Sequence, residues 1–131
     1  MKKSFLIFLI VLCLGGVNGL GAKNKPDFIA AGIVVQKDQF IHIKLQNKSS
    51  VNFSLTPKLK EKIFLTIYIN NVKRADYKIK YIDPKLFKPR GIILFRTNFR
   101  LQKGLSIKVE INRLKVIPES NFLNNQLIKK Y

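Results

Sequence analysis

The chain has 131 residues, with 25 Lys and Arg against 7 Asp and Glu, a single His and a single Cys. One cysteine cannot form a disulfide framework, and one histidine cannot build a zinc site of the usual kind. The formal charge of +18 favours polyanionic partners, although a chain rich in Lys, Asn and Ile also arises from an AT-rich genome without any selected partner.

The first 22 residues have the layout of a secretory signal peptide. Lys2 and Lys3 precede an unbroken apolar run over residues 5–14, and small residues follow, with cleavage expected after Gly19 or after Ala22. The run is about half as long as the roughly 20 residues of a membrane span. The sequence therefore predicts export, with the periplasm, the cell envelope or the medium as the final location.

The only cysteine, Cys13, lies inside this apolar run. A lipidation site needs a small residue just before the cysteine, and Leu12 is not small, so a lipoprotein anchor is disfavoured. The expected mature domain, residues 23–131, has no cysteine and a formal charge of +16, from 23 Lys and Arg against 7 acids. Its size fits one domain, and it contains no further apolar run long enough to span a membrane.

Strand patterns bounded by turn residues begin directly after a polar lead-in. Residues 28–36 are apolar and β-branched, residues 40–46 alternate between apolar and polar, and residues 63–69 form the strongest strand pattern. Asn70-Asn71 suits a tight hairpin turn because asparagine tolerates a positive φ. Residues 72–82 are the expected return strand.

The second half continues in the same way. Residues 83–91 are a loop, and residues 92–95 resume a strand, for which Phe99 is the furthest alternative end. Residues 105–112 alternate cleanly, and a last strand is expected over residues 122–128. No long helical repeat of apolar residues is present after residue 22. About seven short strands at this spacing predict an all-β fold with the architecture of a β-sandwich.

The order of these segments resembles the CARDB domains, cell-adhesion-related modules of exported bacterial and archaeal proteins. The matching segments are Lys-Pro-Asp-Phe-Ile at 25–29, the alternating strand and polar turn at 41–49, and Leu-Thr-Ile-Tyr-Ile-Asn-Asn at 65–71. The most specific piece joins Val-Glu-Ile-Asn at 109–112 to Ile-Pro-Glu-Ser-Asn-Phe-Leu-Asn-Asn at 117–125. The resemblance implies an immunoglobulin-like β-sandwich with adhesion or scaffold character, and it names no ligand.

The chain departs from the family pattern at three places. The family usually has Asp where Asn112 stands, Glu where Phe122 stands, and Gly where Ser49 or Ser50 stands. Phe122 removes an acid from the terminal motif, which argues against a cation site there.

The terminal motif also has a physical interpretation of its own. Glu119 can accept bonds from backbone N–H groups, and the side-chain amides of Asn121, Asn124 and Asn125 can cap backbone groups. We therefore expect a structural clasp between the last two strands.

The residues offer no pattern for catalysis, for a cofactor or for a metal. His42 alternates with Ile41 and Ile43, so it is expected to face outward as an exposed strand residue without a nucleophile beside it. The acids are scattered singly, whereas a glycosidase needs two carboxylates that face each other. Neither a phosphate-binding glycine loop nor a nucleophile elbow is present.

The basic residues form the main candidate binding surface, a patch over the hairpin and the loop that follows it. The same lysines can also serve to keep exposed strand edges from pairing with other chains. The aromatic residues Tyr68, Tyr77, Tyr81, Phe95 and Phe99 are expected mainly in the core. The predicted patch consists of Lys73, Arg74, Lys78, Lys80, Lys85, Lys88 and Arg90.

These features together predict an exported, non-enzymatic binding or adhesion module of the bacterial envelope, with a protein or a surface glycan as partner. The alternative is a secreted basic protein that binds acidic glycan, lipid phosphate or nucleic acid by charge alone, without a specific nucleic-acid motif. Salt dependence distinguishes the two, because binding by charge weakens steeply as salt rises. A third class is a hydrolase with an unrecognised site, and it is disfavoured because the sequence shows no clustered titratable groups.

Overall fold

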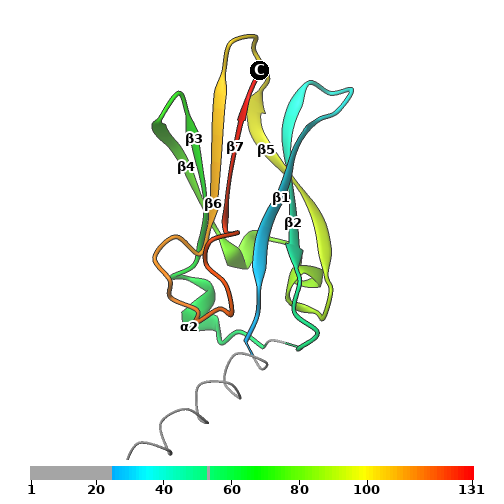
Figure 1. The fold of residues 1–131 in the computed structure, drawn as a ribbon, viewed down its shortest axis with the longest axis vertical. Coiled ribbons are helices and arrows are strands. Elements are labelled where there is room, and N and C mark those ends of the chain that lie inside the picture. The colour runs from blue at the N-terminus through cyan, green and yellow to red at the C-terminus, as the bar shows by residue number, and fades with distance from the viewer. Residues whose placement is uncertain (1–24, 53) are drawn as a thin grey trace, which may run out of the picture.

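The computed structural model describes residues 25–52 and 54–131, which form two antiparallel β-sheets packed face to face (Figure 1). The first sheet has the order β1-β2-β5 and the second has the order β4-β3-β6-β7. The expected signal peptide and Cys13 lie outside the described residues. The strands are β1 Phe28–Val35, β2 Phe40–Asn47, β3 Phe64–Ile69, β4 Val72–Lys78, β5 Ile92–Arg100, β6 Ser106–Ile111 and β7 Gln126–Lys130.

Alternation along the strands explains why two layers form. In β6, Ile107, Val109 and Ile111 are fully buried while the residues between them are partly exposed. The inward residues of β2, Ile41 and Ile43, face them from the other sheet with 0% exposure. One face of each sheet therefore closes on a shared apolar interior, as in other sandwiches.

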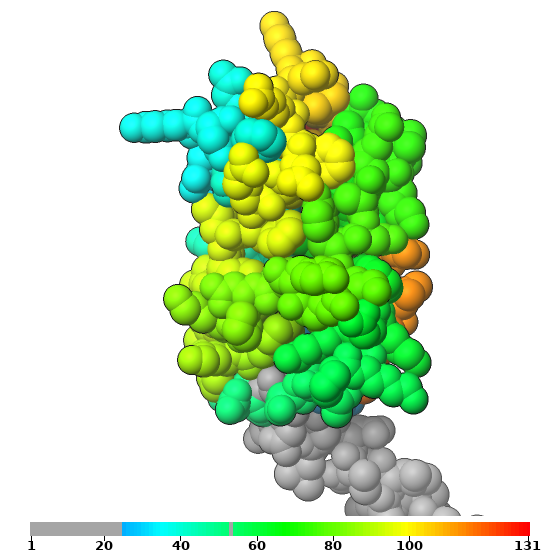
Figure 2. Space-filling model, turned by 180° about the vertical axis from the view of Figure 1, so that it is seen from behind, coloured from blue at the N-terminus to red at the C-terminus, as the bar shows by residue number. Residues whose placement is uncertain are grey.

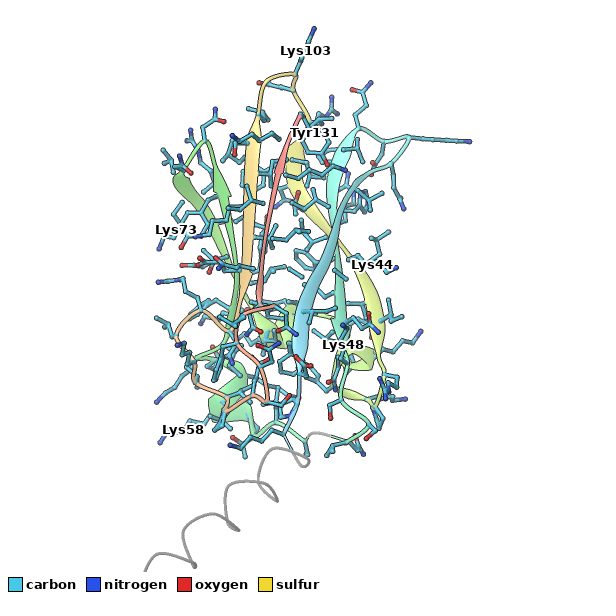
Figure 3. All side chains as sticks on the ribbon, viewed as in Figure 1. Lys44, Lys48, Lys58, Lys73, Lys103 and Tyr131 are labelled. Atoms are coloured by element: carbon cyan, nitrogen blue, oxygen red, sulfur yellow. The ribbon has the colours of Figure 1, made fainter. Side chains whose placement is uncertain are left out.

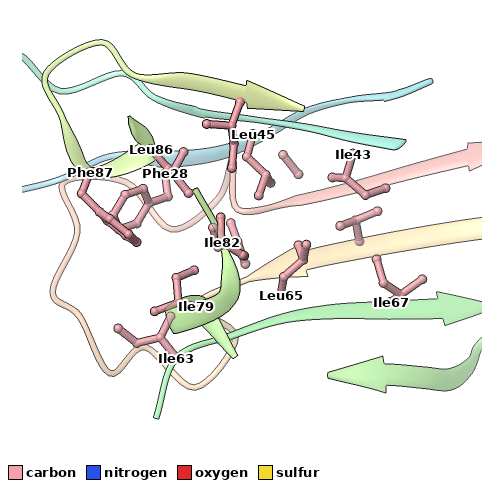
Figure 4. Close-up of a cluster of buried hydrophobic side chains, with 14 of the residues drawn as sticks. Phe28, Ile43, Leu45, Ile63, Leu65, Ile67, Ile79, Ile82, Leu86 and Phe87 are labelled. Atoms are coloured by element: carbon pink, nitrogen blue, oxygen red, sulfur yellow. The ribbon is translucent and has the colours of Figure 1, made fainter. Parts of the chain in front are cut away.

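Short helical turns close one end of this interior. The segment between β4 and β5 folds into η1 Ile79–Tyr81 and η2 Pro84–Phe87. Their apolar side chains, including Ile79 and Leu86, are buried in the same cluster as Phe28 (Figure 4). The Phe87 ring packs edge-on against Phe28, with 5.8 Å between ring centroids. Seen from behind, this segment passes between the green β3–β4 region and yellow β5 (Figure 2).

The two open sides of the sandwich are closed differently. On one side β1 and β7 are the edge strands, and Lys129 Nζ and Tyr131 OH both donate to the carbonyl oxygen of Ile33, at 3.2 and 3.3 Å. On the other side β4 and β5 are the edges. They meet at Tyr77, whose ring packs against Phe95 with 4.9 Å between centroids.

The structure corrects two strand boundaries. The return strand ends at Lys78 rather than at residue 82, because Ile79 turns inward into the core through η1. Tyr81 is consequently 71% exposed instead of sharing a buried face with Tyr77. The last strand runs over Gln126–Lys130 instead of residues 122–128, because a turn precedes it.

Helix is confined to short pieces in the described part of the chain. The helix α2 Pro57–Lys60 is capped by Thr56, whose Oγ1 accepts the backbone N–H of Leu59 at 3.3 Å. Among residues 25–52 and 54–131 no helix has the length and apolar character to cross a membrane.

Candidate functional site

The connections between strands differ sharply at the two ends of the sandwich. The four-, two- and five-residue connections 36–39, 70–71 and 101–105 lie at one end, which we call the short-loop end. The other end carries three long connections and the start of the described domain (Figure 1). We call this second end the loop end, and it consists of residues 25–27, 48–63, 79–91 and 112–125.

The loop end carries most of the charge outside the strands. Its described residues include eleven Lys and Arg against four Asp and Glu, a formal balance of +7, while the short-loop end has Lys37 and Lys103 against Asp38. Figure 3 shows Lys48 and Lys58 toward the loop end and Lys103 at the opposite end. The eleven cations are Lys25, Lys48, Lys58, Lys60, Lys62, Lys80, Lys85, Lys88, Arg90, Arg113 and Lys115.

The seven residues of the predicted basic patch divide between the two ends. Lys73 and Arg74 lie on β4 next to the Asn70-Asn71 turn, at the short-loop end. Lys78 is the last residue of β4, and its Nζ donates to Glu61 at 2.7 Å. The remaining members belong to the loop end, and these are Lys80, Lys85, Lys88 and Arg90.

Ion pairing with Glu61 makes two of these cations, Lys78 and Lys80, less available to an anionic ligand. Glu61 contacts both Lys78 and Lys80. The pKa of the Glu61 carboxyl is lowered, and the hydrogen bond from Lys78 is the largest cause. Of the eleven loop-end cations, only Lys80 and Arg113 have a carboxylate oxygen within 4.0 Å among the described residues, so nine have none, including the exposed Lys48, Lys88 and Arg90. These nine side chains are available to meet an outside anion.

A buried asparagine holds these cations in place. Asn47, with 0% exposure, accepts the backbone N–H groups of Asp27 and Ser49 on its Oδ1, at 3.3 and 3.1 Å. Its Nδ2 donates to the carbonyl oxygen of Lys88 at 3.2 Å, and its backbone N–H donates to that of Gly91 at 2.8 Å. One side chain therefore joins the beginning of the domain, the segment after β2 and the segment before β5.

The turn at Arg90 and Gly91 is tight. Arg90 has a φ of 59°, and its backbone N–H donates to the Ser49 carbonyl oxygen at 2.9 Å. A Cβ at Gly91 would meet the Lys85 carbonyl oxygen at 2.0 Å, so only glycine fits there. Beside this turn is a surface hollow lined by three cations, three hydroxyl groups and one carboxylate, contributed by Lys25, Lys48, Arg90, Ser49, Ser50, Ser120 and Asp27.

Glu119 of the terminal motif connects β1 to the segment between β6 and β7. Its Oε2 accepts the backbone N–H of Phe28 at 2.7 Å, and its Oε1 accepts the Nδ2 groups of Asn112 and Asn125 at 2.6 and 2.7 Å. Glu119 is 6% exposed, and this burial raises the pKa of the carboxyl to about 7. The three hydrogen bonds favour the charged carboxylate and so lower the pKa, but the effect of burial is larger.

The other members of the terminal motif act nearby. Asn124 Nδ2 donates to Asp27 Oδ1 at 2.8 Å, and Asn121 Oδ1 accepts the backbone N–H of Leu123 at 2.9 Å. Asn125, directly before β7, donates its Nδ2 to the carbonyl oxygen of Ile111, the last residue of β6, at 3.1 Å. The partners Phe28 and Asp27 belong to the beginning of the domain. The motif therefore contacts both the end of β6 and the beginning of the domain, and Asn112, which was not among the residues of the expected clasp, contributes to it.

The structure corrects the expected exposure of His42. Its side chain does lie on the outer face of its sheet, opposite to Ile41 and Ile43, but it is only 5% exposed. In the strand register Val34 and Arg96 flank it on either side. Its Nδ1 is 2.9 Å from the Phe40 carbonyl oxygen. Neighbouring strands therefore bury it, which alternation within β2 cannot reveal.

The seven carboxylates have local partners. Asp38, Glu61, Asp76 and Glu110 contact lysine or arginine side chains, and Asp83 accepts a backbone N–H in its own turn. Among residues 25–52 and 54–131, no three His, Cys, Asp or Glu side chains come close enough to form a metal-binding group. Each acid serves a contact that supports the fold.

Several cations of the loop end were not part of the predicted patch, including Lys25, Lys48, Arg113 and Lys115. They are far apart in the sequence, and only the fold places them at one end. The sequence did contain a signal for this grouping, because every second connection in an antiparallel sandwich returns to the same end.

Searches against protein-family models, curated proteins and solved structures find no match to this chain.

Proposed function

We propose that this chain is an exported, non-enzymatic binding module of the bacterial cell envelope, which attaches to an anionic envelope component through its loop end. The observation that carries the proposal is the collection of eleven cations on three long connections and the domain start, against four acids. Two of these acids, Glu61 and Glu119, are engaged with lysines or buried amides.

We also propose that the sandwich is immunoglobulin-like and related to the CARDB domains, and the strand order supports this. The first, second and fifth strands form one sheet, and the third, sixth and seventh form the other with the fourth at its edge. Immunoglobulin-like sandwiches use this arrangement when the fourth strand joins the second sheet. The proposed relation to the CARDB domains rests on the segments at 25–29 and 109–125, which meet around Glu119.

A binding role without catalysis fits the state of the carboxylates. General acid–base chemistry needs a titratable group within reach of a substrate. Glu119 is the one acid with a pKa raised toward neutrality, and its two oxygens accept three hydrogen bonds from the protein itself. This places Glu119 in a supporting role at the loop end.

Binding of a soluble polyanion, inorganic polyphosphate, tests the proposal. The first variant carries Lys48→Gln, Lys88→Gln and Arg90→Gln, and the matched control carries Lys37→Gln, Lys103→Gln and Lys130→Gln. We expect the first variant to bind more weakly and to reduce the slope of log K against log salt by about 2 to 3, since each phosphate contact contributes roughly 0.9 on duplex DNA.

The control removes the same charge, away from the loop end. We expect it to keep most of the affinity and most of the slope. Equal losses in the two triple variants would mean that net charge alone governs binding, and the loop end would then not be a binding surface. The same titration separates attachment by shape from attachment by charge, because only the second fades steeply between low and physiological salt.

A further inference from the structure

A second surface hollow lies at the opposite half of the sandwich, between the two edge strands β4 and β5. These strands are joined at Tyr77, whose hydroxyl oxygen accepts the backbone N–H of Asn98 at 3.4 Å. Beyond Tyr77, toward the short-loop end, the strands border a hollow to which the β3–β4 hairpin also contributes. We call it the edge groove, and its lining includes Asn70, Arg74, Asn98, Phe99, Arg100 and Leu105.

Both strands that border the edge groove carry a β-bulge there. In the β3–β4 pair, Ala75 faces Ile67 and Lys73 faces Tyr68, so Arg74 is the extra residue without a partner. In the β2–β5 pair, residues 97–99 stand against Ile41 alone. Bulges redirect side chains out of the regular alternation and are common beside binding sites.

The side chain of Thr97 hydrogen-bonds to the backbone around the bulge in β5. Thr97 is fully buried, its Oγ1 donates to the Ile41 carbonyl oxygen at 2.8 Å, and it accepts the backbone N–H of Phe99 at 3.2 Å. A peptide that added itself as a new strand would need a regular row of free backbone groups. Two facing bulges interrupt those rows on β4 and β5, so recognition in the edge groove falls to side chains.

The charge of the edge groove comes from two guanidinium groups. Among residues 25–52 and 54–131, neither Arg74 nor Arg100 has a carboxylate oxygen within 4.0 Å. The nearest acids along the chain are committed elsewhere, since Asp76 contacts Lys73 and Thr66. The Arg100 guanidinium lies 5.0 Å from the centroid of the Phe40 ring. Guanidinium groups bind carboxylates through paired hydrogen bonds.

The remaining groups of the lining suit a sugar. Asn70 uses its Oδ1 to accept the backbone N–H of Ser106 at 2.9 Å, which leaves its NH₂ group as a donor. Asn98 adds a second, exposed amide, and half-buried Phe99 and Leu105 add apolar surface. Amides match hydroxyl groups, and apolar side chains match the C–H faces of a pyranose ring.

We propose that the edge groove binds acidic sugar units of an anionic polysaccharide, with Arg74 and Arg100 as the cations that pair with sugar carboxylates. The amides of Asn70 and Asn98 bind ring hydroxyl groups, and Phe99 and Leu105 pack against the ring. This site lies apart from the loop end and is independent of the function proposed above. The chain then has two anion-binding regions at opposite ends of one rigid sandwich.

Calorimetric titration of the protein with trigalacturonate and with neutral galactotriose tests this site. We expect trigalacturonate to bind and galactotriose to bind at least about tenfold more weakly, because loss of charge-assisted hydrogen bonds has effects of this size. Arg74→Gln and Arg100→Gln should each weaken trigalacturonate binding about tenfold. Lys37→Gln and Lys103→Gln remove the same charge at the same end outside the groove lining, and should change it less than about twofold.

Three results would overturn the inference: absence of trigalacturonate binding, equal affinity for the neutral sugar, or equal losses in Arg74→Gln and Lys103→Gln. Arg74 is exposed on an edge strand, so its variant should fold, and its thermal midpoint should stay close to that of the parent. The Lys48, Lys88 and Arg90 triple variant should keep its affinity for trigalacturonate. That result separates this site from the loop end, whatever the outcome with polyphosphate.

Discussion

The two ends of the sandwich carry positive charge in different ways. At the loop end many cations lie on long connections of 13 to 16 residues, held by a few buried polar hubs such as Asn47 and Glu119. At the short-loop end the connections are two to five residues long, and Arg74 and Arg100 are placed by bulged strands. The first arrangement suits an extended anionic surface, and the second suits a single small unit.

The largest expected effect is a difference in stability between alanine substitutions at two glycines, Gly91 at the loop end and Gly104 at the short-loop end. Gly91→Ala should destabilise the protein by about 4 kcal/mol, because the new Cβ would overlap the Lys85 carbonyl oxygen at 2.0 Å. Gly104→Ala should cost about 1 kcal/mol, because Gly104 has a φ of 87° but open space around it. Urea unfolding of the two variants measures the difference. Equal midpoints would show that the loop end is not tightly built at this turn.

The next effect is a dependence of stability on pH that belongs to the loop end. The pKa of Glu119 is raised from 4.5 to about 7 in the folded chain, so its contribution is fully present below about pH 4.5 and lost as pH rises through about 7. We expect the free energy of unfolding to fall by about 3 kcal/mol across that window from this group.

Glu119→Gln should flatten the profile between pH 4.5 and 8. The control is Asp38→Asn at the short-loop end, where the hydrogen bond from Arg96 lowers the pKa of the Asp38 carboxyl and so moves its titration below this window. A parent profile that rises from pH 4.5 to pH 7 would contradict the assignment of Glu119 as the buried acid.

A third comparison concerns the buried hub of the loop end. Asn47→Ala should lower stability by about 2 kcal/mol, since it leaves the Lys88 carbonyl oxygen and the N–H groups of Asp27 and Ser49 without their partner. Asn70→Ala at the short-loop end removes one exposed bond to Ser106 and should cost less. Thermal melts rank the pair, and the reverse order would reject Asn47 as the organising residue.

The smallest effect tests the exposed ion pairs of the loop end. Glu61→Gln should leave the melting temperature close to that of the parent, because surface ion pairs contribute little to stability. It releases Lys78 and Lys80, so polyphosphate binding should become stronger and its salt slope steeper by about 1. An unchanged slope would exclude these two lysines from the binding surface.

Sequence patterns predicted the strands well because alternation is a local property. Residues 105–112 and 63–69 match β6 and β3 closely. The prediction went wrong at Ile79, where alternation continues in the sequence but the chain turns to bury that side chain under the sandwich. For His42, alternation predicted the correct face, while its burial depends on Val34 and Arg96 from other strands.

The candidate sites were predictable only in part. Lys85, Lys88 and Arg90 were recognisable as an exposed basic loop, but Arg74 was grouped with them because it is close in sequence. The edge groove depends on two bulges, and a bulge is a property of strand pairing that one sequence does not display. Net charge therefore led to the hypothesis of an anionic partner, and only the fold shows how the charge is divided between the two ends.

Binding of anions at the loop end is tested most directly by a two-dimensional amide NMR titration of the ¹⁵N-labelled protein with polyphosphate at low salt. We expect the largest shifts at residues 48–50, 88–91 and 113–115, while residues 36–39 and 101–105 change little. Shifts that concentrate on the short-loop end, or that spread evenly over all basic residues, would contradict the loop end as the binding surface.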